Sequence, residues 1–278
     1  MAKFRSTFHL QDNFMFYTYS SNKQLLGLKT IVKKIFHQLG FSISKLPKNY
    51  AYHVNAYTDQ QMLLQNQSVR VIFDLGANVG NTAKEYHQLF PQADIYAFEP
   101  SEDTFASLSK TSQGCSSIKP YKLAVAEVSG EEKFYLNQAN MTNSLLQVSQ
   151  DSNRYVDPQL TNNLGTKNVA TVTLDEFCQQ KNINNIDILK MDIQGGEVKA
   201  LTGARQLLAK QSINLVYCEV LFTHLYEKQA YFWDVGNFLQ QYGYIFFGFY
   251  NPYYSKCGSV MWGDAIFISQ KTEHNLTK

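Results

Sequence analysis

Two short segments carry acidic residues and glycines at the spacing of a ligand-binding site. In the first, a β-branched apolar run breaks at Asp74 into a turn that contains Gly76 and Gly80. Such a run is typical of a buried parallel strand followed by a tight turn and a helix, and the two glycines leave no Cβ where a ligand must come close. The second, Asp94–Phe98, has the pattern of another buried strand, and it is followed by Glu99, nineteen positions after Gly80. A carboxylate at the tip of the second strand is placed to accept both hydroxyls of a ribose.

The acid in the first turn decides between two nucleotide ligands. A dinucleotide site has the order G-x-G-x-x-G and places a pyrophosphate on the helix N-terminus. This chain has D-L-G-A-N-V-G, and Asp74 would repel a phosphate. S-adenosylmethionine instead carries an ammonium group, a sulfonium cation and a ribose, which suit Asp74 and Glu99. The sequence therefore predicts S-adenosylmethionine as the cofactor; the alternative for Asp74 alone is a helix cap.

Composition and charge describe one globular core with a basic end. The chain has 278 residues, 44% of them hydrophobic and 17% charged, which is enough for one core and an appendage. Residues 1–70 carry a net charge of +7 and the remainder −5. The four cysteines have neither CxxC nor metal-ligand spacing, and no stretch has the length of a signal peptide core or a membrane span. We expect a cytoplasmic protein.

The expected organisation is a basic helical N-terminal extension, residues 1–56, followed by a methyltransferase domain, residues 57–278. Between Leu25 and Leu39 the apolar residues recur at three- and four-residue steps, which predicts one apolar helical face among lysines. This helix would either cover the catalytic domain, which is the preferred interpretation, or contact an anionic membrane or a partner, including a second copy of the chain. It has no recognisable nucleic-acid motif, so no nucleic acid is expected.

Strands and helices alternate along the rest of the chain, which predicts a parallel sheet covered on both faces. The expected core strands are 69–74, 94–98, 117–125, 186–192, 213–219, 244–250 and 265–269, with helices over 58–67, 82–90, 102–109, from 174, 194–210 and 229–242. Additional strands are expected at 132–137 and 169–173. The polar stretch 138–168 is expected to be a partly ordered lid or substrate loop, 251–263 a loop, and the tail after Lys271 irregular.

The loop 251–263 between the sixth and seventh strands is too short for a helical crossover. The seventh strand must therefore run antiparallel to the sixth. The predicted fold class is thus α/β: a Rossmann-like class I methyltransferase with a seven-stranded, mostly parallel sheet, an antiparallel last strand, and helices on both faces.

Several motifs in the right order resemble the FkbM-type methyltransferases. Residues 71–81 with 97–100 are similar to the first motifs of that family, and residues 142–146, 173–175, 189–197 and 225–229 are similar to later ones. The resemblance spans roughly residues 57–250. Many members carry D-x-E-G-x-E, whereas this chain has Gln194 at the first glutamate, a variant that the family uses. Gln194 can form hydrogen bonds but cannot act as a base.

The resemblance implies methyl transfer from S-adenosylmethionine, usually to an oxygen of a sugar or natural product. Ligands of open α/β sheets bind beyond the carboxyl ends of the strands. The residues expected there to bind the cofactor are Asp74, Gly76, Asn78, Gly80, Glu99, Pro100, Ala124, Val125 and Asp192. The turn residues would hold the methionyl part, Glu99 the ribose, and Ala124-Val125 would lie near the adenine.

The catalytic candidates follow from the chemistry of methyl transfer. The enzyme aligns the nucleophile in line with the sulfonium carbon and removes its proton if it is a hydroxyl. Asp192 is the preferred base or orienting group, although it could equally bind the cofactor or cap the next helix. Glu219 could face the acceptor, and His224 is either a second candidate base or a surface residue. No metal is predicted, because Asp192 and Glu219 lack an obvious third ligand.

The acceptor is expected to contact Asn143, Ser144, Gln194, Tyr253 and Tyr254. The two tyrosines belong to an aromatic loop that would either stack on a sugar ring or pack against the lid. The preferred function is O-methylation of a hydroxyl of a glycan, sugar or small natural product. The alternatives are N-methylation of a similar acceptor and a non-catalytic, cofactor-binding assembly subunit.

Overall fold

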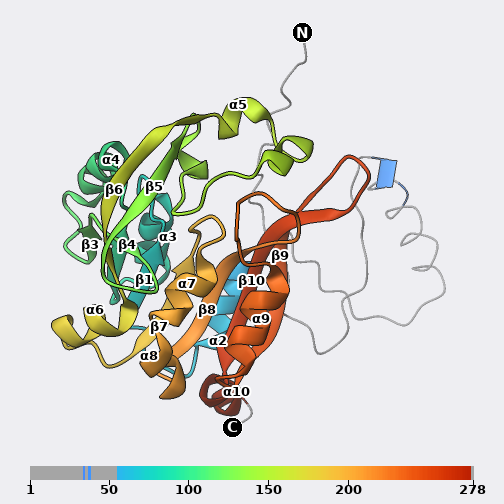
Figure 1. Ribbon diagram of the computed structural model, residues 1–278. Helices are drawn as coiled ribbons and strands as arrows, with labels where there is room; N and C mark the ends of the chain where they lie inside the picture. Colours follow the sequence, from blue (N-terminus) through green and yellow to red (C-terminus); the bar gives the residue numbers. More distant parts are fainter. Residues whose placement is uncertain (1–33, 35–36, 39–54, 277–278) are drawn as a thin grey trace. The chain divides into compact units, whose positions relative to one another are not determined.

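The computed structural model describes residues 34, 37–38 and 55–276 (Figure 1). The chain divides into two compact units, residues 1–50 and 51–278. The predicted N-terminal extension therefore falls almost wholly outside the described residues. Among the helices of the described part, none combines the length and the apolar character of a membrane span.

Seven strands form the main sheet, in the order β3-β2-β1-β7-β8-β10-β9. Their bounds are β1 Val71–Leu75, β2 Asp94–Phe98, β3 Ile118–Tyr121, β7 Ile186–Met191, β8 Ile213–Leu221, β9 Tyr244–Tyr254 and β10 Val260–Ser269. Neighbouring strands from β3 to β8 are parallel, and β10 is antiparallel to both β8 and β9. The predicted fold class, a Rossmann-like sheet with a reversed last strand, is confirmed.

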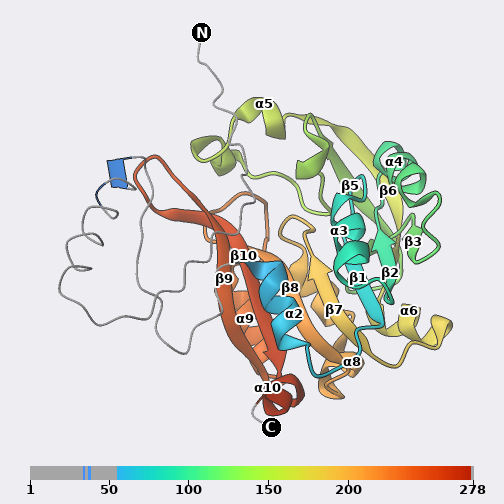
Figure 2. The same cartoon turned by 180° about the vertical axis from the view of Figure 1, so that it is seen from behind.

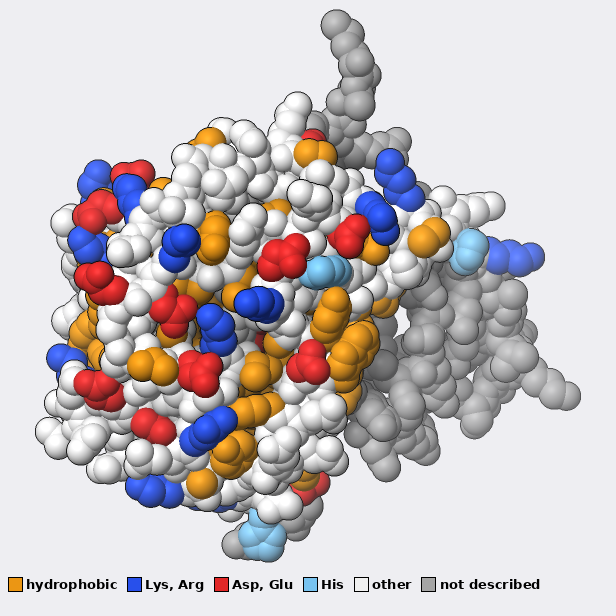
Figure 3. All heavy atoms as spheres, in the orientation of Figure 1, with side chains coloured by type: hydrophobic (Ala, Val, Ile, Leu, Met, Phe, Trp, Pro, Cys, Tyr) orange, Lys and Arg blue, Asp and Glu red, His pale blue; other side chains and the backbone are white. Residues whose placement is uncertain are grey.

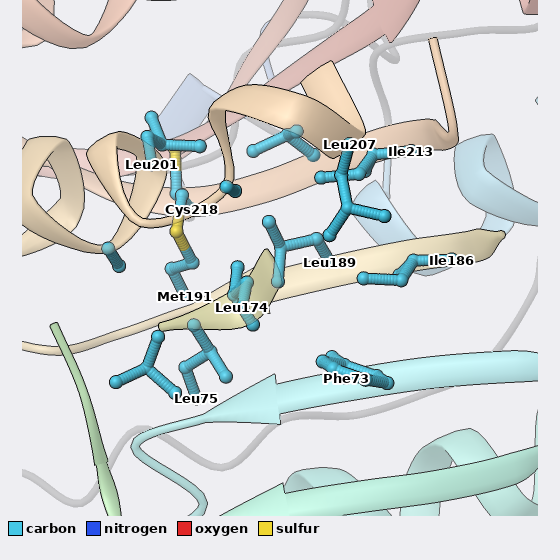
Figure 4. Close-up of a cluster of buried hydrophobic side chains, with 14 of the residues drawn as sticks. Phe73, Leu75, Leu174, Ile186, Leu189, Met191, Leu201, Leu207, Ile213 and Cys218 are labelled. Carbon is cyan, nitrogen blue, oxygen red and sulfur yellow. The ribbon is translucent and has the colours of Figure 1, made fainter. Parts of the chain in front are cut away.

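Helices cover both faces of this sheet (Figures 1 and 2). One face packs against α2 Ala56–Leu63, α3 Asn81–Leu89 and α4 Glu102–Ser112, and the other against α6 Leu174–Lys181, α7 Glu197–Thr202, α8 Arg205–Ala209 and α9 Phe232–Gln240. Consecutive strand residues alternate between the two cores, as the two-residue period of a strand requires: Leu189 belongs to one core and Ile188 to the other. Figure 4 shows the first core, where Leu174, Leu201 and Leu207 meet Leu189 and Met191.

A second, three-stranded sheet, in the order β4-β6-β5, was not foreseen as a unit. It comprises β4 Ala124–Val125, β5 Gly130–Asn137 and β6 Asn163–Val172. The single strand predicted over 117–125 is wrong, because β3 ends at Tyr121 and Ala124 pairs with Thr171 of β6. The chain leaves the edge of the main sheet there and begins the second sheet.

The predicted loop 138–168 is too long, because β6 already begins at Asn163. The remaining polar segment, residues 138–162, is ordered by contacts rather than by a continuous element. It contains two 3₁₀ turns, Asn140–Thr142 and Gln150–Arg154, and the short helix α5 Pro158–Thr161. The Ser149 N–H donates to the Leu225 carbonyl over 2.8 Å, and Val148 forms an isolated bridge with Tyr226. The segment is thus held against the loop that follows β8.

Three predicted boundaries are corrected by local packing. The predicted helix over 194–210 is split into α7 and α8 around Gly203, where a Cβ would lie 2.4 Å from the Ala126 carbonyl oxygen. The predicted loop 251–263 is mostly a β-hairpin, since Tyr253 and Trp262 pair across β9 and β10 and their rings stack at 4.2 Å. The tail, predicted to be irregular, forms α10 Gln270–Leu276. The Ser269 hydroxyl caps this helix by accepting a hydrogen bond from the Thr272 N–H.

The surface seen in Figure 3 mixes Lys and Arg with Asp and Glu, without a large block of either sign. Hydrophobic side chains gather on this view over the region of α9. Trp233, on that helix, is 51% exposed.

Candidate functional site

A pocket lies where the carboxyl ends of β1, β2 and β7 meet the second sheet and the polar segment. Ten of the predicted site residues line it: Gly76, Asn78, Glu99, Pro100, Ala124, Val125, Asn143, Ser144, Asp192 and Gln194. Most of the residues predicted from the sequence therefore lie together at one edge of the sheet. Asp74, Gly80, Glu219, His224, Tyr253 and Tyr254 are absent from the lining.

Glu99 lies in this pocket at the end of β2, with 7% of its surface exposed. Its Oε2 accepts the Asn78 N–H at 3.1 Å, and its Oε1 accepts the Ser101 N–H at 2.9 Å. Burial raises the pKa of Glu99 to about 7, against the lowering effect of these two backbone donors. The carboxyl is thus fixed in orientation and titrates near neutral pH.

The turn after β1 is pressed against the end of β7. Gly76 has φ +75°, and a Cβ there would lie 2.0 Å from the Asp192 carbonyl oxygen. Only glycine fits this position, because both the backbone conformation and the close approach exclude a side chain. Asn78 also has a left-handed backbone, with φ +49°, and its N–H points to Glu99. The turn thereby brings the tips of β1, β2 and β7 together.

Gly80 has a different role from the one expected. A Cβ at Gly80 would lie 2.7 Å from Thr111 Cγ2 and 2.8 Å from Leu108 Cδ1, both on α4. Gly80 is also the N-cap residue of α3, with φ +90°. It therefore allows α3 and α4 to pack closely, and it does not line the pocket.

Asp74 is completely buried and forms an ion pair with Lys190, Asp74 Oδ1 to Lys190 Nζ over 2.9 Å. The two residues are register partners on β1 and β7, and the Lys190 ammonium also donates to the Gly76 carbonyl over 3.3 Å. The neighbouring Asp74 carboxylate supports the charged form of Lys190 and raises its pKa despite burial. Asp74 thus fixes the Lys190 ammonium, which in turn hydrogen-bonds the Gly76 carbonyl of the turn. The N-cap residue of α3 is Gly80, so the helix-cap alternative for Asp74 is wrong.

Asp192, Gln194 and Glu219 form one hydrogen-bonded network at the mouth of the pocket. Gln194 Nε2 donates to Asp192 Oδ1 at 2.8 Å and to Glu219 Oε2 at 2.9 Å. Gln194 Oε1 accepts the Tyr226 hydroxyl at 2.7 Å. Gln194 itself has φ +56°. The glutamine that departs from the family's usual glutamate therefore bridges the carboxyl groups of Asp192 and Glu219.

Glu219 is the member of this network that favours its protonated form. Burial raises its pKa well above the ordinary value, and the nearby Asp192 and Glu197 carboxylates raise it further. Asp192 is exposed, and no described residue donates to its Oδ2. The open carboxylate oxygen in the pocket belongs to Asp192.

Glu197 is almost completely buried below this network. Its Oε1 accepts the Ile193 N–H at 3.2 Å, and burial raises its pKa to about 7. It holds the turn between β7 and α7.

His224 and the two tyrosines lie elsewhere. His224 Nδ1 is 4.0 Å from Asp151 Oδ2, on the polar segment. Tyr253 and Tyr254 are 52% and 55% exposed near the tip of the β9–β10 hairpin. The Tyr253 ring stacks on the Trp262 ring, so it packs within the hairpin and does not lie in the pocket.

Lys190 and Tyr226 were not among the site residues predicted from the sequence. A lysine between Leu189 and Met191 in a fully buried strand was the available signal, because a buried ammonium needs a partner. Tyr226 gave no local signal. Its hydroxyl lies 2.7 Å from Gln194 Oε1 and 3.2 Å from the Thr142 carbonyl oxygen, contacts that only the fold creates.

The pocket fits a nucleoside that carries positive charge. Its described lining contains only two charged side chains, Glu99 and Asp192, and both are acids. Apolar walls come from Phe98, Leu123 and Phe134. Such a site suits a ribose, a flat base and a cation, and disfavours phosphates. In the described part of the chain, no group of three or more His, Cys, Asp or Glu residues could hold a metal ion.

Residues 74–246 match the family model of the methyltransferase FkbM domain, which is more than half of the chain. The chain belongs to the FkbM methyltransferase family. The predicted family is thereby confirmed, and with it the predicted enzyme class and cofactor of the domain, an S-adenosylmethionine-dependent methyltransferase.

Two curated relatives of this FkbM chain bear functional names. It is 27% identical to the 2-O-methyltransferase NoeI of Sinorhizobium fredii over 163 residues, covering 57% of this chain and 66% of the relative. It is 26% identical to the hexuronic acid methyltransferase AglP of Haloferax volcanii over 151 residues, covering 54% of this chain and 55% of the relative. The chain thus spans less than two thirds of either relative.

Solved structures with a similar chain path include an FkbM methyltransferase from Methylobacillus flagellatus KT, with 13% identity and a TM-score of 0.46, covering 72% of this chain and 44% of that one. Another is the magnesium protoporphyrin IX methyltransferase ChlM of Synechocystis PCC 6803 with bound SAM, with 12% identity and a TM-score of 0.39, covering 91% of this chain and all of that one.

Proposed function

We propose that this FkbM chain transfers the methyl group of S-adenosylmethionine to a hydroxyl oxygen of a sugar. The observation that carries the proposal is the charge of the pocket: its described lining offers two carboxylates, Glu99 and Asp192, and no ammonium or guanidinium group. The names of the two curated relatives, a 2-O-methyltransferase and a hexuronic acid methyltransferase, support a sugar acceptor.

Each part of the cofactor has a matching group in the chain. In the ionised form, Glu99 accepts the two ribose hydroxyls, with its carboxylate held in place by the Asn78 and Ser101 N–H groups. Phe98, Leu123 and Phe134 would form the apolar walls for the base. When bound, the cofactor supplies a methyl group already activated by its sulfonium charge.

Asp192 is the group proposed to receive the acceptor's proton. Gln194 holds Asp192 Oδ1, so Oδ2 is the oxygen that can accept a hydroxyl hydrogen. Burial of Glu219, on the other side of Gln194, favours its protonated form, so Glu219 adds no negative charge beside Asp192. The chain's contribution is to orient the hydroxyl and hold its proton, since the methyl donor is already activated.

The charge of the pocket favours a neutral hydroxyl over a uronate as acceptor. A hexuronic acid would place its carboxylate near Asp192, and the described lining has no Lys or Arg to balance it. A hydroxyl of a neutral sugar carries no such cost.

Calorimetry and product analysis test this proposal. The chain should bind S-adenosylhomocysteine, and Glu99→Gln should weaken binding by about tenfold or more. With radiolabelled S-adenosylmethionine, neutral sugars should gain an O-linked methyl group, and Asp192→Asn should lose transfer while it still binds S-adenosylhomocysteine. Transfer to nitrogen, or binding without transfer to any sugar, would favour the N-methyltransferase or the non-catalytic alternative.

A further inference from the structure

A second hollow lies in the polar segment, outside the cofactor pocket. Its volume is about 270 Å³. We call it the amide groove, because it is lined chiefly by amide and hydroxyl side chains, among them those of Gln147, Ser149, Ser152, Asn153, Asn162 and Asn163. Amides and hydroxyls both donate and accept hydrogen bonds, as sugar hydroxyls do.

One hydroxyl in the groove has no partner. Ser152 is 1% exposed, and its buried Oγ forms no hydrogen bond. A buried polar group without a partner costs about 1–3 kcal/mol, so native proteins rarely keep one without a reason. A shift of the polar segment that opens the groove toward Ser152 would let a ligand hydroxyl provide the missing partner.

The groove is electrically neutral. Its described lining contains no Asp, Glu, Lys, Arg or His. Of the acids next to lining residues in the sequence, Asp151 contacts Arg154 at 3.3 Å and His224 at 4.0 Å, and Asp157 Oδ1 accepts the Gln159 N–H at the start of α5. The groove thus suits an uncharged polyhydroxylated ligand better than a phosphate or a uronate.

One continuous stretch of chain connects the groove to the cofactor pocket. Residues 143–145 line the pocket, and residues 147–150 line the groove. At about 3.3 Å per residue, the Cα atoms of Leu145 and Ser149 lie at most about 13 Å apart. Tyr226 contacts a lining residue of each site, since its hydroxyl donates to Gln194 of the pocket and its backbone bridges Val148 of the groove. Linked sugar units could therefore occupy both places at once.

We propose that the amide groove binds a neutral sugar unit next to the one that is methylated, so that the acceptor is an oligosaccharide rather than a free monosaccharide. This proposal rests on the proposed sugar O-methyltransferase function and specifies its acceptor. The groove fixes the acceptor's register, and the hydroxyl beside Asp192 is the one that reacts.

The test compares sugar chain lengths on the full chain saturated with S-adenosylhomocysteine. The probes are methyl glycosides of glucose, galactose, mannose and N-acetylglucosamine and their di- and trisaccharides, titrated by saturation-transfer NMR. The groove variants are Ser152→Ala and Asn162→Ala, and the matched control is Asn168→Ala, an exposed asparagine of β6 outside the groove. Ser152→Ala removes a hydroxyl without a partner, so it should leave the stability unchanged or raise it.

For at least one sugar series, a longer chain should bind the wild type and Asn168→Ala about tenfold more tightly than its monosaccharide. That advantage should fall to about threefold or less in both groove variants, with unchanged affinity for the monosaccharide and for S-adenosylhomocysteine. Equal affinity for all chain lengths, or an advantage that both groove variants keep, would overturn the inference. If S-adenosylhomocysteine binds but no sugar does, the sugar acceptor of the proposed function fails and this inference fails with it.

Discussion

At the scale of single residues, Glu99 links the cofactor pocket to pH. Its pKa of about 7 comes from burial, so lowering the pH from 8 to 6 converts most of the carboxylate to its neutral form. The neutral form accepts ribose hydroxyls less well. The affinity for S-adenosylhomocysteine should therefore fall by about tenfold over this range, as measured by calorimetry. Glu99→Gln should bind weakly at every pH; a wild-type affinity independent of pH would contradict the assigned role.

The buried pair Asp74–Lys190 gives a second residue-scale prediction. Lys190→Met leaves the fully buried Asp74 without its counter-ion, which should lower the free energy of unfolding by about 3–5 kcal/mol. The double variant Asp74→Asn with Lys190→Met should recover much of this loss, because no uncompensated charge remains. Urea denaturation measures both. Equal losses in the single and double variants would show that packing, and not charge, is responsible.

Several single residues could be assigned from sequence because their environment follows from strand order. Glu99 and Asp192 end buried strands, so the rule for the carboxyl edge places them in the pocket. Asp74 could not be assigned in this way, because its partner Lys190 lies on β7 and is brought beside it only by the register of the sheet. For the same reason, the sequence did not predict the hydrogen bonds by which Gln194 bridges Asp192 and Glu219.

At the scale of elements, the turn between β1 and α3 depends on Gly76. Gly76→Ala places a Cβ 2.0 Å from the Asp192 carbonyl oxygen, a backbone atom that cannot turn away. Gly114 is the matched control, since it has a similar φ of +84° but nothing within 4 Å of the added Cβ. Gly114→Ala should cost about 1–2 kcal/mol for the left-handed conformation alone. Gly76→Ala should cost more and abolish S-adenosylhomocysteine binding; equal costs in denaturation would rule out the close approach.

Elements buried on both faces were predictable, and elements defined by distant partners were not. β2 has the predicted bounds Asp94–Phe98, because a short apolar run between turn signals identifies such a strand. β4 is two residues long and is a strand only because β6 lies beside it, more than forty residues later in the sequence. Only the distal part of the β9–β10 hairpin, residues 251–263, was assigned as a loop, because its Tyr, Asn and Pro residues carry no clean alternation.

At the scale of the whole molecule, the buried acids make stability depend on pH. Glu99 and Glu197 both have pKa values near 7 in the folded state, against 4.5 for the ordinary group. The folded chain thus binds protons more tightly than the unfolded chain. This stabilisation is complete below pH 4.5 and is lost as the pH rises through 7, so the free energy of unfolding should fall between pH 5 and pH 8.

Glu197→Gln tests this dependence away from the pocket lining. The amide oxygen can still accept the Ile193 N–H, and the variant removes one titrating group, worth up to about 3 kcal/mol. Its decline in stability from pH 5 to pH 8 should therefore be shallower than that of the wild type. Exposed Glu131→Gln is the control and should follow the wild type. Parallel curves for Glu197→Gln and wild type would exclude Glu197 as a source of the slope.

The close approach at Gly203 limits which parts of the domain can open. A Cβ there would meet the Ala126 carbonyl, the Asp175 N–H donates to the Gly203 carbonyl at 2.9 Å, and the Asp175 carboxylate caps α8 through Gln206 and Leu207. These contacts fasten the base of the second sheet to the helices of the main one. A hinge between the two sheets would have to break these contacts, so we expect ligand entry and product release to depend on movement of the polar segment instead.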